Sequence, residues 1–221
     1  MRNLISEGGI LGMDRIEEWS RELFSFDVRP FLEERIFTPG EFILREGSFP
    51  QHLYFLTQGR AKIYTTHKNG KVSLLSFPAA PDLIGDMELL EVRRGSLCVQ
   101  ALTRCHFWVV DSRRCLPQLR EDPKFLWFLC NHVARRSARQ TSTLTIQQAY
   151  PLRNQLAAFL LMASEGDRYR QRHTEAAEYL GVSYRHLLYV LAQFRQEGLI
   201  AREGGEYRIL DRAALEALAA G

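Results

Sequence analysis

The sequence predicts an α+β protein with an N-terminal β-roll, a long central helix and a C-terminal winged helix-turn-helix. Short alternating segments separated by glycine fill residues 33–111, a single helical stretch runs over 122–150, and small and apolar residues in 173–194 fall where two helices cross tightly. With 221 residues, 46% of them hydrophobic, the chain can bury a full core and suits two modest domains. We expect an N-terminal helical segment at 1–31, the roll at 32–121, the central helix at 122–150 and the winged helix at 151–221.

An amphipathic helix is predicted around residues 14–26, because Ile16, Trp19, Leu23 and Phe24 fall on one side of it. The candidate strands that follow lie at 42–44, 53–56, 61–65, 72–77, 98–102 and 107–110. Glycines fall between these strands, and Asn69-Gly70 favours a two-residue hairpin turn. This spacing predicts a small barrel or roll.

The stretch 122–150 predicts one long helix, which Pro123 opens in its first turn and which ends before Pro151. Its middle is polar, and its apolar residues near the two ends are Phe125, Leu129, Val133 and either Leu144 or Ile146. Such a helix needs a partner along its length, and a second copy lying parallel to it would place two helix-turn-helix motifs about one DNA turn, ~34 Å, apart. The alternative is a helix that lies on its own roll.

The run from 173 to 194 predicts two helices joined by a short turn. Ala177 allows close crossing of the helices, and Gly181 tolerates the positive φ that the turn needs. One buried face is expected to hold Ala176, Leu180, Val182, Leu187 and Val190. An ordinary helical hairpin is the alternative, but it does not require the small residue, the turn glycine and the apolar set in register together.

The outward side of the second helix carries a short polar and aromatic set that suits base edges and phosphates of double-stranded DNA. The candidate DNA-binding residues are Ser183, Tyr184, Arg185, His186 and Tyr189, together with Arg172, His173 and Thr174 at the start of the first helix. Beyond this motif, Gly198 is expected to cap the second helix, and residues 200–210 predict two short strands around Gly204 and Gly205. These strands would form the wing.

The net charge of the chain says little about DNA binding, whereas the distribution of charge around the predicted helix-turn-helix is informative. The net charge is +3, and the nine basic and nine acidic residues from 151 onward cancel. No acidic residue lies between 181 and 195, and Arg168, Arg170 and Arg172 lie just ahead of the motif. A charge run is usually a solvated face, but this one surrounds the candidate DNA-binding helix.

The N-terminus lacks a basic start followed by an apolar core, and no run approaches the roughly 18 apolar residues that span a bilayer, so we expect a cytoplasmic protein. The four cysteines form no C-x-x-C pair, and we expect buried free thiols. They are Cys98, Cys105, Cys115 and Cys130.

Two runs, PGEFILREGSFPQHLYFLTQGRAKIY and LIGDMELLEVRRGSLCVQALT, combined with the order of roll, long helix and winged helix, resemble the CRP/FNR superfamily of bacterial transcription regulators. The run HTEAAEYLGVSYRHLLYVLAQF is similar to the YeiL branch of that superfamily. The resemblance covers nearly the whole chain. It implies a homodimer with a cyclic-nucleotide-binding-like roll that binds a two-fold DNA operator. It also implies that a small effector or a redox signal switches this binding, and that RNA polymerase is a further partner.

In the cyclic-nucleotide-binding members that this chain resembles, a Gly-Glu pair contacts the ribose and an Arg-Ser pair contacts the cyclic phosphate. Here Gly85 and Ser96 match, Asp86 is one methylene shorter than Glu, and Gly95 stands where the phosphate Arg is expected. Arg94 is adjacent, but a shift of one residue points a side chain elsewhere. Loss of this charged contact would cost about 2–5 kcal/mol, so cyclic AMP is disfavoured as the effector.

The long-helix residues that match ligand contacts of the family are Gln140 and Thr141, which either line a pocket or form a solvated weak point of a paired helix. The candidate effector pocket therefore consists of Gly85, Asp86, Arg94, Gly95, Ser96, Gln140 and Thr141. An iron–sulfur cluster is not indicated, because family members that hold one carry most of its thiolates near the N-terminus and no cysteine precedes Cys98 here. Haem is not indicated either, no metal is predicted, and the cofactor stays unknown.

The best-known family members use a Glu where this chain has Arg185 and an Arg where it has Tyr189, so the preferred operator should differ. No H-x-H pair and no G-x-S-x-G motif occurs, and we therefore expect no enzyme. The remaining alternative is a small-molecule-binding or interaction module on the roll without direct operator binding.

Overall fold

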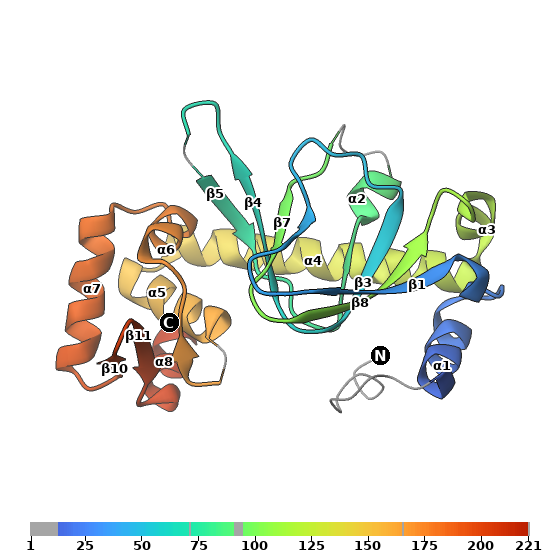
Figure 1. The fold of residues 1–221 in the computed structure, drawn as a ribbon. Helices are drawn as coiled ribbons and strands as arrows, with labels where there is room; N and C mark the ends of the chain where they lie inside the picture. The colour runs from blue at the N-terminus through green and yellow to red at the C-terminus, as the bar shows by residue number, and fades with distance from the viewer. Residues whose placement is uncertain (1–12, 71, 91–94, 165, 221) are drawn as a thin grey trace. The chain divides into compact units, whose positions relative to one another are not determined.

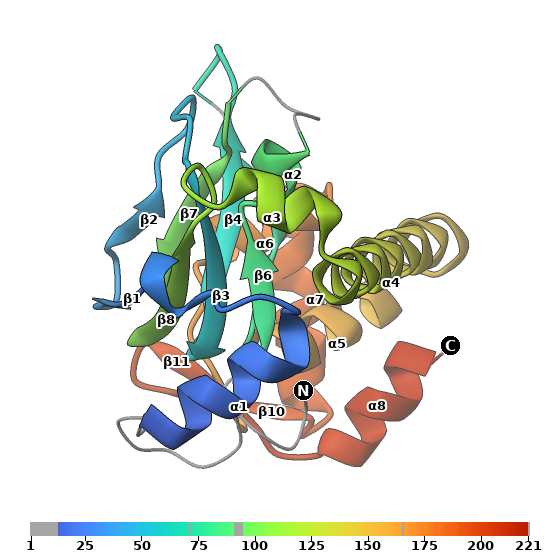
Figure 2. The ribbon, with the colours of Figure 1, turned by 90° about the vertical axis from the view of Figure 1, so that its right-hand side faces the viewer.

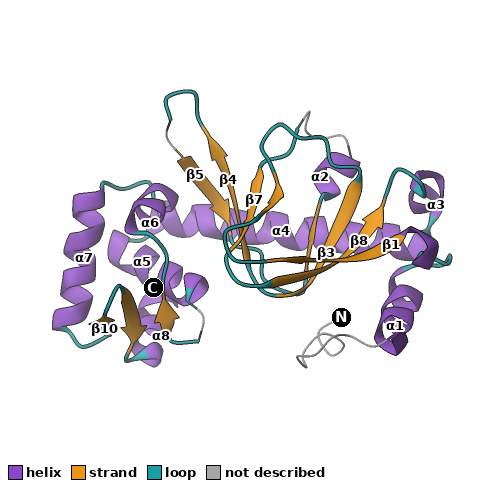
Figure 3. Cartoon of the chain, in the orientation of Figure 1, coloured by secondary structure: helices purple, strands orange, loops and turns teal. Residues whose placement is uncertain are grey.

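The computed structural model describes residues 13–70, 72–90, 95–164 and 166–220, with the side chains of 13–15 and 142–148 left out. The chain forms two compact units, which are treated separately. The first unit comprises Met1–Thr65 and Ser76–Ser137, and the second comprises Thr66–Leu75 and Ala138–Gly221. Strands are concentrated before the long helix and helices after it, as the α+β class predicts (Figure 3).

The roll consists of two four-stranded sheets, in which the strand pairs with a defined register are antiparallel (Figure 1). The order of one sheet is β1 (Leu32–Phe37), β8 (Cys105–Asp111), β3 (His52–Gln58) and β6 (Asp82–Ile84). The order of the other is β2 (Phe42–Leu44), β7 (Cys98–Ala101), β4 (Ala61–Thr66) and β5 (Val72–Ser76). The register places Trp108 opposite both Glu34 and Phe55, because β8 lies between β1 and β3.

All six predicted strands are present. The predictions missed β1 and β6, which are the two edge strands of the first sheet. The sequence of β1 is LEERIF, and three successive charged residues hide its alternation. The turn prediction at Asn69-Gly70 was wrong by one residue, because Gly70 N donates to His67 O at 2.8 Å and the turn is therefore centred on Lys68-Asn69.

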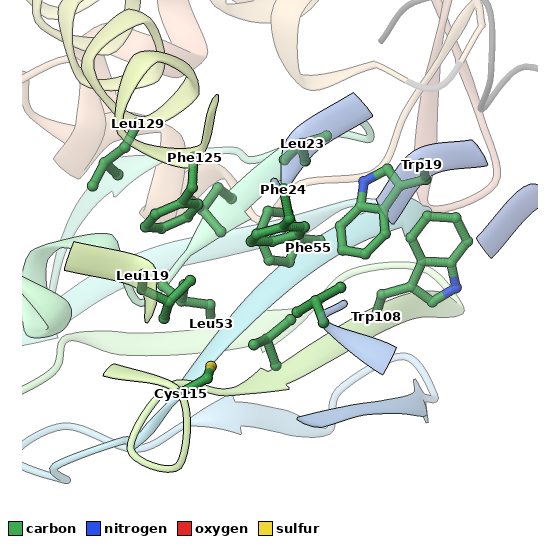
Figure 4. Packing of buried hydrophobic residues seen from close by; sticks show 13 residues of the cluster. Trp19, Leu23, Phe24, Leu53, Phe55, Trp108, Cys115, Leu119, Phe125 and Leu129 are labelled. Atoms are coloured by element: carbon green, nitrogen blue, oxygen red, sulfur yellow. The ribbon is translucent and has the colours of Figure 1, made fainter. Parts of the chain in front are cut away.

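Alternate residues of the central strands face two different cores. Tyr54 and Leu56 of β3 belong to the core inside the roll, whereas Leu53 and Phe55 face the outside of the sheet. The outer cluster is covered by helices (Figure 4). Trp19 contacts Trp108 and Phe55 edge-on, with ring centroids 4.5 and 4.9 Å apart. A strand buried on both faces must be apolar throughout, which explains the continuous hydrophobic run of β3.

The helices of the first unit close this outer cluster. They are α1 (Met13–Leu23), the 3₁₀ helix η1 (Arg29–Phe31), α2 (Asp86–Leu89), α3 (Leu116–Glu121) and the first part of α4 (Pro123–Ala149). Figure 2 shows α4 nearly along its axis, with α2 and α3 near its N-terminal end. Asp122 starts α4, since its carboxylate Oδ1 accepts from Lys124 N at 2.9 Å and from Phe125 N at 3.3 Å.

The first part of α4 lies on its own roll, which was the alternative considered for the long helix. Phe125 and Leu129 are buried in the outer cluster, and Val133 packs against it. Leu144 and Ile146 fall where no side chains are described. The start of the predicted apolar stripe is therefore covered by the roll of the same chain. A different side of α4 exposes Leu126 and Trp127, and Trp127 is 74% exposed.

The second unit contains the helix-turn-helix and the wing. Its elements are α5 (Leu152–Ala163), β9 (Arg168–Tyr169), α6 (His173–Tyr179), α7 (Tyr184–Gln196), β10 (Ile200–Glu203), β11 (Glu206–Ile209) and α8 (Arg212–Ala220). Gly198 has a φ of 75°, and Leu199 N donates to Phe194 O at 2.9 Å, so the predicted left-handed cap is present. The predicted wing hairpin turns at Gly204 and Gly205, and β9 adds a third strand.

The predictions did not include α5, β9 or α8. Leu156 and Leu215, from the two added helices, are fully buried with Leu187 and Phe194 of α7. The amide of Asn154 also donates to Leu218 O at 2.8 Å. Within the described residues, none of the helices has the length and hydropathy that a bilayer crossing requires.

Candidate nucleic-acid interface

The helix-turn-helix is built on small residues where its two helices meet. Ala176 and Ala177 of α6 are buried, and Val182 N donates to Ala177 O at 3.0 Å across the turn. Gly181 has a φ of 66°, but a Cβ added there would meet nothing within 4 Å. The turn therefore requires glycine for its backbone conformation alone, and the close packing depends on the alanines.

The helix α7 has one buried face and one open face. Ser183 caps its start, because the Ser183 hydroxyl accepts a hydrogen bond from His186 N at 3.2 Å. The buried face is formed by Leu187, Val190, Leu191 and Phe194. The predicted outward residues are all exposed: Ser183, Tyr184, Arg185, His186 and Tyr189. Tyr189 is 62% exposed, and Tyr184 beside it on the open face is 48% exposed.

The three candidates ahead of α7 divide into two kinds. Arg172 and Thr174 are exposed, whereas His173 is half-buried among aromatic rings. The ring of Tyr169 is parallel to the imidazole with a centroid separation of 6.4 Å, and Tyr207 lies 5.4 Å away. Burial lowers the pKa of His173 below its ordinary value, and the nearby Arg202 guanidinium lowers it further.

The basic residues around the motif differ in how far their charge is compensated. Glu206 pairs with Arg170 at 2.9 Å and lies 3.8 Å from Arg168, so one negative charge is shared by two of the three arginines ahead of the motif. Around the motif, the arginines that form no ion pair with the described residues are Arg172, Arg185, Arg195 and Arg202. The positive charge left available therefore lies on α7, just before α6 and on the wing strand β10.

The candidate effector pocket contains an acid that is already paired. Asp86 is only 2% exposed, and Arg136 of α4 contacts both its oxygens, with Nη1 at 3.0 Å from Oδ1 and Nη2 at 2.7 Å from Oδ2. His132 Nε2 lies 3.9 Å from Asp86 Oδ2 and 3.8 Å from Asp82 Oδ1. The carboxylate that matches a ribose contact is thus bound to the long helix of its own chain.

The other pocket candidates also make contacts within the roll. Gly85, with a φ of 96°, passes so close to β3 that a Cβ would lie 2.6 Å from His52 O. A Cβ on Gly95 would lie 3.1 Å from the Cα of Gly47. Ser96 is buried, and its hydroxyl donates to Ser48 O at 2.8 Å and lies 2.8 Å from the Ser48 hydroxyl.

The remaining candidates belong to the second unit or are not described. Gln140 and Thr141 are exposed and belong to the second unit. Arg94 lies outside the described residues. Sequence reasoning missed Arg136 and His132, although both continue the helical phase of Phe125 and Leu129 toward the roll, a signal that could have identified them.

The cysteines are all free, and three of the four are buried as expected. Cys130 is exposed, which corrects the expectation for that residue, because it lies on the side of α4 away from the roll core. Burial raises the pKa of the Cys115 thiol to about 11, and Asp111 adds to that shift. Within the described residues, no group of three His, Cys, Asp or Glu is placed to hold a metal ion.

Comparison with known proteins agrees with this geometry. Residues 34–122 match the cyclic nucleotide-binding domain, and residues 154–218 match the Crp-like helix-turn-helix domain. The regulatory protein YeiL of Escherichia coli O157:H7 is 45% identical over 199 residues, which is 90% of this chain and 91% of that protein. The cyclic AMP receptor protein of Thermus thermophilus is 25% identical, with 86% of this chain and 90% of that protein covered.

Solved structures share the fold. A CRP-family transcriptional regulator from Thermus thermophilus has a TM-score of 0.70 at 24% identity, covering 85% of this chain and 97% of that one. Another CRP/FNR-family regulator from the same organism has a TM-score of 0.71 at 20% identity, covering 86% and 99%. Since the relative at 45% identity spans nearly the whole length of both proteins, the chain belongs to the CRP/FNR family of DNA-binding transcription regulators.

Proposed function

We propose that this protein is a homodimeric regulator that binds a two-fold operator through α7 and responds to a small effector or a redox signal. The observation that carries the proposal is the open face of α7, where the side chains of Arg185 and Tyr189 make no hydrogen bond or ion pair with the described chain. A cation on such a helix suits the major groove, where Arg donates to O6 and N7 of guanine. Residues 151–221 would form the DNA-binding domain.

The base contacts are assigned to α7 and the backbone contacts to the residues around it. Arg185 lies in the first turn of α7, near the helix end that usually enters the groove, with Tyr184, His186 and Ser183 beside it. Arg172 and Thr174 are exposed at the start of α6 and suit phosphate oxygens. Reversal of charge relative to the family's usual Glu predicts a preference for guanine at the position that Arg185 contacts.

A second copy would pair along α4, with 122–150 acting as the dimerisation helix. Trp127 is 74% exposed, and Leu126, Cys130 and Ala134 are exposed along the same part of the helix. A contiguous patch of exposed apolar side chains often marks a protein–protein interaction site. Pairing of two such helices would cover them and would bring two copies of α7 to one face of DNA.

The roll, 32–121, would act as the sensor, and we propose that its effector is not cyclic AMP. The ribose-matching Asp86 is held by Arg136, and Gly95 supplies no charge for a cyclic phosphate. A cyclic nucleotide would have to break the Asp86–Arg136 pair and would meet no guanidinium at position 95, where the family's phosphate Arg is expected. A regulator of this kind acts on DNA in the cytoplasm, and we assign it no catalytic activity.

Operator selection tests the proposal. The wild-type protein and the Arg185→Ala variant are each used to select duplexes from a random library, and the affinities are measured by fluorescence anisotropy. We expect Arg185→Ala to lower specific binding by about 1–3 kcal/mol and to relax selection at one position per half-site. The control Gln196→Ala changes an exposed residue at the other end of α7 and should leave the operator unchanged.

Two further outcomes separate the alternatives. Sedimentation of Arg185→Ala should still show a dimer, because the substitution is remote in sequence from α4. Binding of the wild-type protein should weaken steeply as salt rises, since phosphate neutralisation releases counterions. An interaction module that does not contact DNA would show no saturable binding at any salt concentration, and an Arg185→Ala variant with the wild-type operator profile would reject the assigned role of Arg185.

A further inference from the structure

His173 lies where three elements of the second unit meet. As the first residue of α6, its ring is parallel to Tyr169 of β9 and lies 5.4 Å from Tyr207 of β11, measured between ring centroids. The ring of Tyr184, the first residue of α7, is 6.4 Å away. The imidazole is therefore held between the wing and the helix that we assign to the major groove.

The imidazole has no compensating charge in this position. It makes no hydrogen bond and no ion pair within the described residues. Its surroundings are three tyrosine rings and the positive field of Arg202 from β10. Both burial and Arg202 hold the pKa of His173 below its ordinary value of 6.5, so the free protein carries this residue neutral at neutral pH.

The other charged groups on the elements around His173 do not reverse the lowering of its pKa. Glu175 on the same helix raises the pKa of Tyr169, after the larger effect of burial, but does not contribute to the shift of His173. On the strands, Arg168 and Arg170 are engaged with Glu206, and Arg208 pairs with Glu203 at 3.1 Å. On α7, Arg185 adds positive charge beside Tyr184. None of the described acids is within ion-pair distance of the imidazole.

We propose that His173 is a proton-linked phosphate contact: its imidazole takes up a proton when a DNA phosphate docks beside it, so that operator binding is coupled to proton uptake. The proposal rests on the proposed function, because it requires DNA at this face. The flanking residues Arg172 and Thr174 are exposed and could contact phosphates of the same DNA strand. A phosphate supplies the negative charge that the described chain does not, and it stabilises the imidazolium that Arg202 and burial disfavour.

The sign of the effect follows from linkage. Binding of the phosphate raises the pKa of His173 from below 6.5, so affinity rises as pH falls through the window between the free-state and bound-state pKa values. Within that window, uptake of one proton changes the affinity by up to about tenfold per pH unit. Affinity levels off above the bound-state pKa, where neither state is protonated, and below the free-state pKa, where both are.

The test measures affinity for a labelled duplex carrying the operator selected by the wild-type protein, at constant ionic strength from about pH 5.5 to about pH 8. We compare the wild-type protein with His173→Gln, which cannot titrate, and His173→Arg, which is always charged. The control is His67→Gln, which removes an exposed histidine of the turn between β4 and β5, outside the proposed DNA-binding residues. We expect the wild-type protein and His67→Gln to bind several-fold more tightly at the acidic end. Both His173 variants should show affinities that do not change with pH, and His173→Arg should bind more tightly than His173→Gln at the alkaline end.

A second measurement needs no variant. Calorimetric titration of wild-type protein with the same duplex in two buffers of different ionisation enthalpy gives the number of protons taken up, and we expect a value between zero and one near neutral pH. Zero uptake at every pH, or an unchanged pH dependence in His173→Gln, would overturn the inference and leave operator binding intact. Absence of saturable binding by the wild-type protein would overturn the proposed function and this inference together.

Discussion

Substitution of Arg136 by methionine tests whether the buried ion pair holds α4 on the roll. The variant keeps most of the aliphatic stem and removes the guanidinium that contacts Asp86 at 2.7 and 3.0 Å. Asp86 would remain inside the protein, since it is only 2% exposed. His132 Nε2, 3.9 Å from Asp86 Oδ2, is too distant to replace both contacts.

The expected cost lies at the lower end of the range for buried pairs. Removal of one partner of a buried pair costs about 3–5 kcal/mol because a buried charge is left uncompensated, whereas exposed pairs are worth about 0–1 kcal/mol. The Arg136 side chain is 26% exposed, so water can reach the vacated position and solvate part of the Asp86 charge. We therefore expect Arg136→Met to lower the free energy of unfolding of the first unit by about 3 kcal/mol.

Intrinsic fluorescence isolates this unit. All three tryptophans, Trp19, Trp108 and Trp127, lie in it, so a urea titration followed by tryptophan emission reports its unfolding. The matched control is Arg135→Met, which changes an exposed neighbour on the same helix and should cost less than about 0.5 kcal/mol.

A double-mutant cycle with Asp86→Asn completes the test. The coupling energy between positions 86 and 136 should be about 0.5–3 kcal/mol, the range for residues that share one network. A loss below about 1 kcal/mol in Arg136→Met, or an equal loss in Arg135→Met, would refute the assignment of a buried pair.

Four other outcomes test glycine backbone conformation, thiol burial and the specificity of the roll. Gly59→Ala should fail to fold or lose more than about 3 kcal/mol, because its Cβ would lie 2.3 Å from Arg104 O at a φ of 97°. Gly181→Ala should cost only about 1 kcal/mol, since a Cβ there meets nothing and only the φ of 66° is unfavourable; thermal unfolding followed by circular dichroism compares the two, and equal losses would contradict the explanation. Iodoacetamide at about pH 8 should modify Cys130 first, because the raised pKa of Cys115, about 11, leaves roughly one thiolate in a thousand; rapid modification of both in the folded protein would show the burial to be wrong. Saturating cyclic AMP should leave the melting temperature unchanged, and a rise that depends on its concentration would disprove our view of the roll.

The helix-turn-helix and the Gly198 cap of its second helix were predictable because their signals are local. A positive φ at Gly181, the left-handed cap at Gly198 and the apolar spacing of α7 each depend on residues within one or two turns of helix. The exposed candidates of α7 follow from the same periodicity, since a helix with one buried face must present the other. The central strands β3 and β8 were equally recognisable from their continuous apolar runs.

Less could be predicted where an element depends on its neighbours. The edge strand β1 consists largely of charged residues and is a strand only because β8 pairs with it in register. The helices α5 and α8 were missed, although α8 packs on α5 and α5 packs on α7, and both added helices carry buried leucines. In the roll, Asp86 looked available for a ligand because its partner Arg136 lies 50 residues further along the chain.

The amino-acid sequence alone determined the order of roll, long helix and winged helix, the family, and which face of α7 is exposed, because periodicity, capping and turn chemistry act over a few residues. The tertiary structure decided that Arg136 occupies the Asp86 carboxylate, that the apolar start of α4 covers its own roll, and that His173 is enclosed by three tyrosine rings. These features arise from contacts between distant segments, whose pairing depends on the packing of the whole unit rather than on any local pattern.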